Sequence, residues 1–177
     1  AMADPVKKNN EVPPFDEEFD VVVIGYGFAG ALAAITAADK GCKVLLAEKA
    51  GNPGGISICS GGAMRSAHDA DEAFAYLKAT NGGRTPDDVI RVLADGMTTI
   101  EQEIRKLAAV SGASITTREK GGNYPFPGVD TFYHTNITSV PGHETQEGTY
   151  PHIMARPSAN GWRVFRVLED NVNKRGI

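Results

Sequence analysis

The sequence predicts an α/β fold built on a parallel sheet flanked by helices, and three consecutive segments support this. Residues 19–24 are a β-branched run with no polar alternation after Asp20, which is typical of a parallel strand buried on both faces. Residues 27–40 are alanine-rich and predict a helix, with Gly41 placed for a left-handed cap. Residues 43–48 predict a second strand, so the segments form a β-α-β unit with a right-handed crossover.

The next part of the chain predicts a loop followed by a helix. Residues 50–62 contain too many glycines for any regular element and are expected to form a loop. A helix is expected over residues 68–80. Asp69 or Asp71 would begin it, because an aspartate side chain accepts hydrogen bonds from the free N–H groups of a first helical turn.

A longer helix is expected from Thr85 to about Val110. A threonine hydroxyl would cap it, a proline would take the first helical position, and Gly96 would be its weak point. Residues 113–117 favour a strand, whereas residues 119–154 are punctuated by Gly and Pro and show no helical period. We therefore predict that this second stretch is irregular.

The last segment predicts one more helix. Ser158 or Asn160 would cap it, apolar residues would face inward, and Gly176 would end it. Ile177 would then be the first residue of a new strand. The sequence thus gives few strong strand signals, and the last of them comes at its final residue.

The number of strands bears on the domain organisation. A doubly wound sheet needs several strands, and buried parallel strands with unpaired edges are not stable alone. We therefore expect residues 18–177 to be the N-terminal part of a nucleotide-binding domain. A second chain or further sequence would complete it, and residues 1–17 would be a flexible arm.

Composition excludes several classes of protein. The chain has 177 residues, 41% apolar and 23% charged, which is typical of a globular protein. Its net charge of −4 provides no general attraction for nucleic acid or an anionic membrane surface. Its apolar runs are too short to span a membrane. The two cysteines, Cys42 and Cys59, favour reduced thiols and a cytoplasmic location.

A glycine motif follows the first predicted strand. Residues 25–30 read G-Y-G-F-A-G, which is G-x-G-x-x-G between a buried strand and a helix. Gly25 would allow the tight turn, Gly27 would let the backbone approach a pyrophosphate, and Gly30 would allow close helix–strand packing. The N-terminus of the helix would then direct N–H groups and a partial positive charge at the phosphates. This context predicts a dinucleotide site.

Glu48 ends the second predicted strand. A carboxylate in this position accepts hydrogen bonds from an adenosine ribose, and it argues against a 2′-phosphate and therefore against NADP. The alternative is a solvated glutamate at the end of a strand. The complete strand–turn–helix–strand context favours the ribose.

A second glycine segment, G-G-I-S-I-C-S-G-G, occupies residues 54–62. Here the sequence resembles the superfamily of FAD-dependent fumarate reductases and 3-ketosteroid dehydrogenases, in which such a loop follows the acidic strand end. The resemblance is strong over residues 19–62 and weaker beyond. It implies a Rossmann-like FAD-binding domain, incomplete in this chain. Its cofactor-binding residues would be Gly25, Gly27, Phe28, Ala29, Gly30, Glu48, Lys49, Gly54, Gly55, Ile56, Ser57, Ser60, Gly61 and Gly62.

The roles within that loop also follow from the resemblance. Gly54, Gly55 and Ser57 would contact phosphate, and Ser60 to Gly62 would contact the flavin ring, because backbone amides without side chains approach an anion closely. Relatives with covalent flavin carry a histidine in this loop. None lies between residues 51 and 62, so FAD is expected to be held without a covalent bond.

The resemblance implies hydrogen transfer at a C–C bond next to a carbonyl or carboxylate. In the ketosteroid branch one tyrosine facing the substrate lies in the region of residues 121–134, where Tyr124 and Tyr133 are weak catalytic candidates. Each is alternatively a loop tyrosine that packs its ring. The expected partners are a small-molecule substrate and a second polypeptide with the rest of the FAD domain and a capping domain.

Two alternatives remain at this point. The chain could be part of an NAD-dependent dehydrogenase, against which the second glycine segment counts. It could instead be a non-catalytic nucleotide-binding or assembly subunit. A metal site would need converging ligands, and the spacing of His134, His143 and His152 fits no metal pattern, so none is expected.

Overall fold

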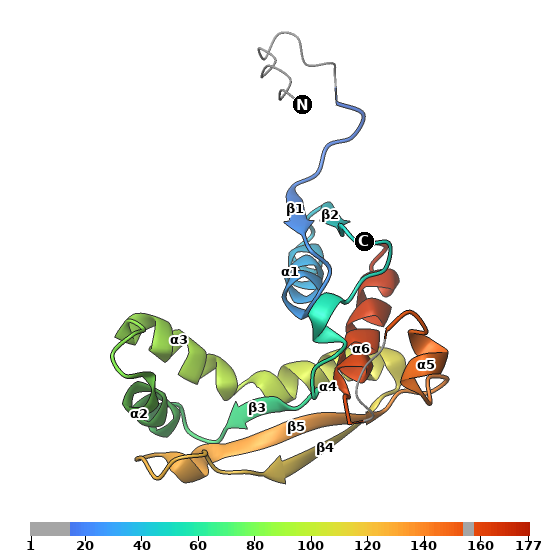
Figure 1. Ribbon diagram of the computed structural model, residues 1–177. Helices are drawn as coiled ribbons and strands as arrows, with labels where there is room; N and C mark the ends of the chain where they lie inside the picture. Colours follow the sequence, from blue (N-terminus) through green and yellow to red (C-terminus); the bar gives the residue numbers. More distant parts are fainter. Residues whose placement is uncertain (1–14, 154–157) are drawn as a thin grey trace, which may run out of the picture.

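The computed structural model describes residues 15–153 and 158–177. These residues form a two-stranded sheet and a three-stranded sheet, joined and covered by helices (Figure 1). Most of the predicted N-terminal arm lies outside the described residues, and residues 15–17, which are described, are exposed. Over the described part of the chain, every helix is too short or too polar to cross a lipid bilayer.

The predicted β-α-β unit is confirmed. Strand β1 (Val21–Ile24) pairs in parallel with β2 (Val44–Ala47), and helix α1 (Phe28–Asp39) connects them. Burial on both faces is wrong for the described residues, because Val22 is 56% exposed and Ile24 is 88% exposed. Helix α1 covers the other face of the pair, and no described element covers this one.

An antiparallel sheet contradicts the predicted irregular stretch over residues 119–154. Its strands are β3 (Met64–Ala67), β4 (Ser114–Glu119) and β5 (Phe132–Ser139), in the order β3-β5-β4. Strand β4 confirms the strand predicted at residues 113–117, whereas β3 and β5 were not predicted. Strand β5 carries polar and apolar side chains on both faces, so the alternation that marks a strand is blurred.

Helix α2 (Ala70–Asn81) confirms the helix predicted over residues 68–80. Of the two proposed starting residues, Asp69 is the cap: its carboxylate accepts a hydrogen bond of 2.8 Å from the N–H of Glu72. The helix ends at Gly82, whose φ of +63° is the left-handed conformation that glycine adopts readily.

The long helix predicted from Thr85 to Val110 is two helices, α3 (Asp87–Met97) and α4 (Ile100–Ser111). The break lies at Thr98 and Thr99, whose hydroxyls donate to the carbonyls of Asp95 and Gly96 at 2.7 and 3.0 Å. These side chains compete with the backbone for hydrogen bonds and so end the helix. The predicted hydroxyl cap by Thr85 is also wrong, because Pro86 occupies the cap position.

Two helices complete the chain: α5 (Gln146–Thr149) and α6 (Gly161–Lys174), the helix predicted at the C-terminus. Asn160 takes the cap position of α6 without a side-chain cap bond. Helix α6 packs against α1 and α4, and its buried Asn171 donates to the carbonyl of Leu107 in α4 at 2.9 Å. This helix carries much of the core: Val164, Phe165, Val167, Leu168 and Val172 are all buried.

Candidate cofactor site

The first glycine segment forms a tight turn between β1 and α1. Gly25 has a φ of +100° and donates its N–H to the carbonyl of Ala47 at 2.7 Å, which fixes the turn to the end of β2. Gly30 lies against the same turn: a Cβ there would stand 1.8 Å from the carbonyl oxygen of Gly25. Only glycine fits at position 30 without moving the backbone, as the motif predicts.

The first turn of α1 keeps free N–H groups. The first intrahelical bond is donated by Ala31 to the carbonyl of Gly27, and Phe28 donates its N–H to Oγ of Ser57 at 3.2 Å. Among the described residues, the N–H groups of Ala29 and Gly30 have no hydrogen-bond acceptor. A helix end with such groups and a positive dipole is suited to bind phosphate.

Glu48 joins the glycine turn to the loop after β2. Its carboxylate oxygens accept hydrogen bonds of 2.8 Å from the N–H groups of Tyr26 and Ala50. These backbone hydrogen bonds, first that of Ala50 and then that of Tyr26, lower the pKa of Glu48, so the carboxylate is held ionised. The side chain is exposed and keeps acceptor capacity for ribose hydroxyls, while Lys49 beside it is also exposed.

The second glycine segment folds onto the first. Gly54 is buried, has a φ of +105° and donates its N–H to the carbonyl of Tyr26 at 2.6 Å. A Cβ at Gly54 would meet the side chain of Ile58 at 2.1 Å. Gly55 to Ser57 then form a short 3-10 helix, which leaves Ile56 86% exposed. These contacts bring residues 54–57 beside the N-terminus of α1.

The end of the second glycine segment contacts helix α6. Gly161 donates its N–H to the carbonyl of Ser60 at 2.9 Å, and a Cβ on Gly62 would stand 2.5 Å from the carbonyl carbon of Asn160. A Cβ added to Gly61 would meet no described atom within 4 Å. No sequence motif marks Asn160 and Gly161 as part of this site. The only sequence signal is the small residue Gly161 at the start of α6, and its role becomes visible only from its packing against the second glycine segment.

A buried aromatic cluster supports both glycine segments. Tyr26 packs edge-on against Phe165 with ring centroids 5.3 Å apart, and Ile58 and Trp162 belong to the same cluster. Within the described residues the hydroxyl of Tyr26 is buried without a hydrogen-bond partner. Burial, and then the nearby Glu169, raise the pKa of Tyr26, so the hydroxyl stays protonated.

The two catalytic candidates lie apart from each other. Tyr124 is 59% exposed in the loop before β5, where its N–H is bonded to the hydroxyl of Tyr76 at 3.1 Å. Tyr133 lies in β5, is buried and stacks on His68 with ring centroids 4.5 Å apart. Burial, and then Glu101, raise its pKa. No described contact joins either tyrosine to the glycine segments.

The three histidines whose spacing in the sequence fits no metal-site pattern lie in separate environments. His134 is in β5, His143 bonds Thr149 through Nδ1 at 3.3 Å, and His152 meets the edge of Tyr150. Among residues 15–153 and 158–177, no three His, Cys, Asp or Glu side chains converge as metal ligands.

The arrangement fits a dinucleotide. The glycine turn leaves room that side chains would fill, the free N–H groups of α1 suit a phosphate, and the ionised Glu48 suits a ribose. The hydrogen bonds from Phe28 to Ser57 and from Gly54 to Tyr26 hold the two glycine segments against each other.

Comparison with known proteins identifies a sequence family that matches this chain. Residues 20–177 match the sequence family described as FAD binding domain. The chain is 37% identical over 105 residues to the urocanate reductase of Eggerthella lenta, covering 51% of this chain and 17% of that protein. It is 31% identical over 157 residues to the 3-oxo-5-alpha-steroid 4-dehydrogenase of Comamonas testosteroni, covering 82% of this chain and 28% of that protein. The chain thus spans less than a third of these relatives.

Solved structures share the fold. The 3-ketosteroid-Δ4-(5α)-dehydrogenase of Rhodococcus jostii RHA1 matches with a TM-score of 0.69 at 18% identity, over 97% of this chain and 39% of that one. A flavocytochrome c3 fumarate reductase matches with a TM-score of 0.60 at 21% identity, over 92% of this chain and 26% of that one. The resemblance drawn from the glycine segments is confirmed, and the family match favours FAD over NAD.

Proposed function

This chain belongs to the FAD binding domain family, with FAD as its cofactor, and we propose that it is the dinucleotide-holding part of a flavin oxidoreductase. The reaction would add hydrogen to, or remove it from, a C–C bond next to a carbonyl or carboxylate. The names of its relatives, a urocanate reductase and a 3-oxo-5-alpha-steroid 4-dehydrogenase, support this reaction class. FAD, when bound, supplies the hydride exchange.

One observation carries the proposal: the two glycine segments meet at the carboxyl end of the parallel strand pair, joined by the Phe28–Ser57 and Tyr26–Gly54 hydrogen bonds. The N-terminus of α1, with Gly27 to Gly30, would hold the pyrophosphate together with Gly54, Gly55 and Ser57. Glu48 would accept the ribose hydroxyls, and its exposed neighbour Lys49 would lie beside the adenosine.

The remaining loop residues would serve the flavin. Ser60, Gly61 and Gly62 would lie along the ring, and the contact of this stretch with the start of α6 holds its backbone in place. Ile56, which is 86% exposed, would cover the cofactor. Residues 51–62 contain no histidine, so we propose that FAD is held without a covalent bond.

The proposal includes the rest of a Rossmann-like domain. The open face of β1 and β2, with Ile24 88% exposed, and the small share of its relatives that the chain spans both support a larger flavoprotein. A second polypeptide or further sequence would supply the remaining strands and the substrate domain. We also propose a cytoplasmic location, based on Cys42 and Cys59, which are free thiols in the structure.

The first test compares Gly27→Val with Gly51→Ala in the flavoprotein that contains this chain. A Cβ at Gly27 would stand 3.1 Å from Oγ of Ser57, inside the proposed pyrophosphate site, whereas Gly51 has open space. We expect Gly27→Val to lower the ratio of FAD to protein about tenfold or more, through lost charge-assisted hydrogen bonds. Gly51→Ala should keep it. Unchanged flavin content in Gly27→Val would show that the motif does not hold the cofactor.

A second measurement separates the enzyme from a non-catalytic subunit. Native mass spectrometry of the purified flavoprotein should show this chain's sequence together with the remaining polypeptide and one FAD. The flavin absorbance should then fall on anaerobic addition of a reducing substrate of the proposed class. A flavin that no unsaturated or saturated carbonyl or carboxylate compound reoxidises or reduces would favour a binding role without turnover.

A further inference from the structure

One residue of the first glycine segment, Tyr26, contacts the other two parts of the proposed cofactor site through its backbone. The G-x-G-x-x-G motif leaves its position open to any residue. Its N–H donates to Oε2 of Glu48 at 2.8 Å, and its carbonyl oxygen accepts the N–H of Gly54 at 2.6 Å. A single residue thus joins the proposed ribose carboxylate to the proposed pyrophosphate loop.

The side chain of Tyr26 rests on helix α6. Its ring meets that of Phe165, which is fully buried, with centroids 5.3 Å apart. Tyr26 also packs against the buried cluster that contains Val164 and Leu168 of the same helix. Because buried side chains are close-packed, the ring cannot move without repacking these neighbours. Helix α6 therefore fixes the ring, and the ring fixes the backbone of the glycine turn.

A polar network holds α6 itself in place. Arg166 is bonded to Asp170 and, at 3.0 Å, to Glu169. Ser111 at the end of α4 donates to Asp170 at 2.7 Å, and Tyr150 after α5 donates to Glu169 at 2.8 Å. These hydrogen bonds tie α6 to two other parts of the fold. The surface that α6 offers to the Tyr26 ring is therefore fixed from both sides.

The ring of Tyr26, and not its hydroxyl, makes this contact. Within the described residues the hydroxyl is buried without a hydrogen-bond partner, so it ties the turn to no other group. Tyr150 provides the comparison, because its ring packs on the same Phe165 with centroids 5.8 Å apart and its hydroxyl is bonded to Glu169. No described hydrogen bond joins Tyr150 to either glycine segment. The two tyrosines share a cluster and differ in their contact with the cofactor site.

We infer that Tyr26 is a positioning residue of the cofactor site: its ring, packed on α6, fixes the backbone N–H and carbonyl that place Glu48 and Gly54. A displaced ring shifts both groups together, and hydrogen bonds weaken steeply as their geometry departs from the optimum. The effect falls on the adenosine and pyrophosphate half of FAD. The inference rests on the proposed function, because it takes Glu48 and Gly54 as residues that bind this half.

The test measures the affinity of FAD and of ADP for the flavoprotein that contains this chain, after its FAD has been removed. Tyr26→Leu, and Tyr26→Met as a second variant, remove the ring and should each weaken both ligands about tenfold or more. Tyr150→Leu is the matched control: it removes a ring from the same cluster and should lower the thermal midpoint, but change both affinities less than about threefold. Tyr26→Phe keeps the ring and should bind both ligands within about twofold of wild type.

The other outcomes overturn the inference. Wild-type affinity in Tyr26→Leu and Tyr26→Met would show that the ring does not position the site. Equal losses in Tyr26→Leu and Tyr150→Leu would make the effect a general one of cluster stability. A loss in Tyr26→Phe as large as in Tyr26→Leu would assign the role to the hydroxyl, and a loss for FAD without one for ADP would place the effect at the flavin. A wild-type protein that binds neither ligand would contradict the proposed function as well.

Discussion

At the residue scale, Gly30 is the glycine of the candidate cofactor site that leaves the least room for a side chain. The Cα of Gly30 faces the carbonyl of Gly25, and a Cβ would reach 1.8 Å from that oxygen. This carbonyl belongs to the turn that the Gly25–Ala47 hydrogen bond ties to the end of β2. Moving the carbonyl away from a Cβ at position 30 would therefore strain that hydrogen bond. The motif therefore needs glycine at position 30 for packing, whereas the proposed role of Gly27 is to give the cofactor access to the backbone.

Gly30→Ala should destabilise the flavoprotein by ~3 kcal/mol or more, because the added methyl group forces the backbone of α1 away from the turn. Thermal unfolding followed by circular dichroism, together with the ratio of FAD to protein, measures both effects. Gly96→Ala is the matched control. That position lies in α3 with no atom near its Cβ direction, and the substitution should stabilise by roughly 0.5–1 kcal/mol. Equal midpoints for the two variants would contradict the packing argument.

The sequence predicts the glycine segments separately, but their contact depends on the fold. The N–H of Phe28 donates a hydrogen bond to Oγ of Ser57, 29 residues further along the chain. No local sequence pattern predicts this bond. Gly161 is a similar case, because its role against Ser60 appears only when α6 docks on the loop. Residues that act through the backbone of one motif can be predicted, whereas residues that position the motif by tertiary packing cannot.

At the scale of elements, the sequence predicts those helices and strands whose segment carries a single clear residue pattern. The apolar run of β1 and the alanine run of α1 have a single clear pattern, and both elements form. Strand β5 mixes Thr, Asn and His with aromatic residues and was missed, because its pairing with β3 and β4 stabilises it more than its own pattern does. The α3–α4 break was missed because the hydroxyls of Thr98 and Thr99 override a continuous apolar stripe.

An ion pair joins the ends of two elements, α1 and α6. Arg175 donates from its guanidinium to both carboxylate oxygens of Asp39, at 2.6 and 2.9 Å. Hydrogen bonding to Arg175 is the main cause that lowers the pKa of Asp39. The folded state therefore binds this proton less tightly than the unfolded state. Its contribution to stability is present above the unfolded pKa, about 3.9, and is lost as the pH falls through the folded pKa.

Asp39→Asn should lower stability at pH 7 by less than about 1 kcal/mol, since the Asp39 side chain is 55% exposed and water screens the pair. The difference from wild type should shrink as the pH falls below about 4, because wild-type Asp39 then loses its charge as well. Thermal unfolding across a pH series measures this. Asp16→Asn, which removes an exposed carboxylate before β1, is the control and should change stability at pH 7 by less than about 0.5 kcal/mol. If the stability difference between wild type and Asp39→Asn grew as the pH fell, the assigned direction of the Asp39 pKa shift would be wrong.

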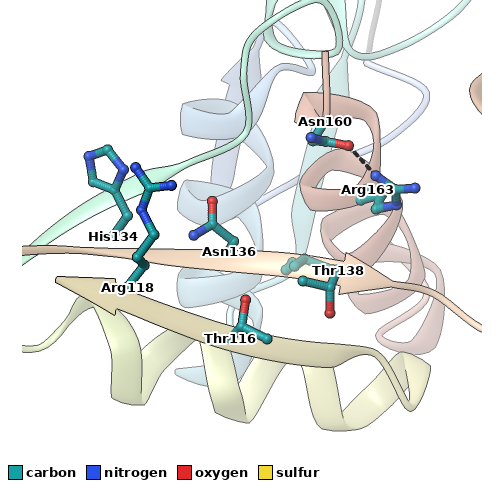
Figure 2. Close-up of a pocket in the computed structure, with 8 residues that line it drawn as sticks. Thr116, Arg118, His134, Asn136, Thr138, Asn160 and Arg163 are labelled. Atoms are coloured by element: carbon teal, nitrogen blue, oxygen red, sulfur yellow. Dashed lines mark hydrogen bonds between the residues drawn. The ribbon is translucent and has the colours of Figure 1, made fainter. Parts of the chain in front are cut away.

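At the scale of the whole molecule, the two sheets differ in how completely they are covered. The antiparallel sheet lies against α4 on one face (Figure 1). A cavity lined by Arg118, His134 and Arg163 opens on its other face (Figure 2). Among residues 15–153 and 158–177, the parallel pair lies against α1 on one face only, and its exposed face presents three apolar side chains: Val22, Ile24 and Leu45. Parallel sheets are covered on both faces in stable proteins. The open face thus fits the finding that the chain spans 17–28% of its relatives.

Ile24→Lys tests whether that face is buried in the complete flavoprotein. If the remaining strands and helices cover it, the substitution removes about 2 kcal/mol of apolar burial and also places a charge in a dry interface, so the thermal midpoint should fall steeply. Ala33→Lys, on the exposed side of α1 in the same β-α-β unit, should cost less than about 0.5 kcal/mol. Small and equal effects of both substitutions would mean that β1 and β2 keep an open apolar face even in the flavoprotein. In that case the missing strands do not pack where the Rossmann-like proposal requires them.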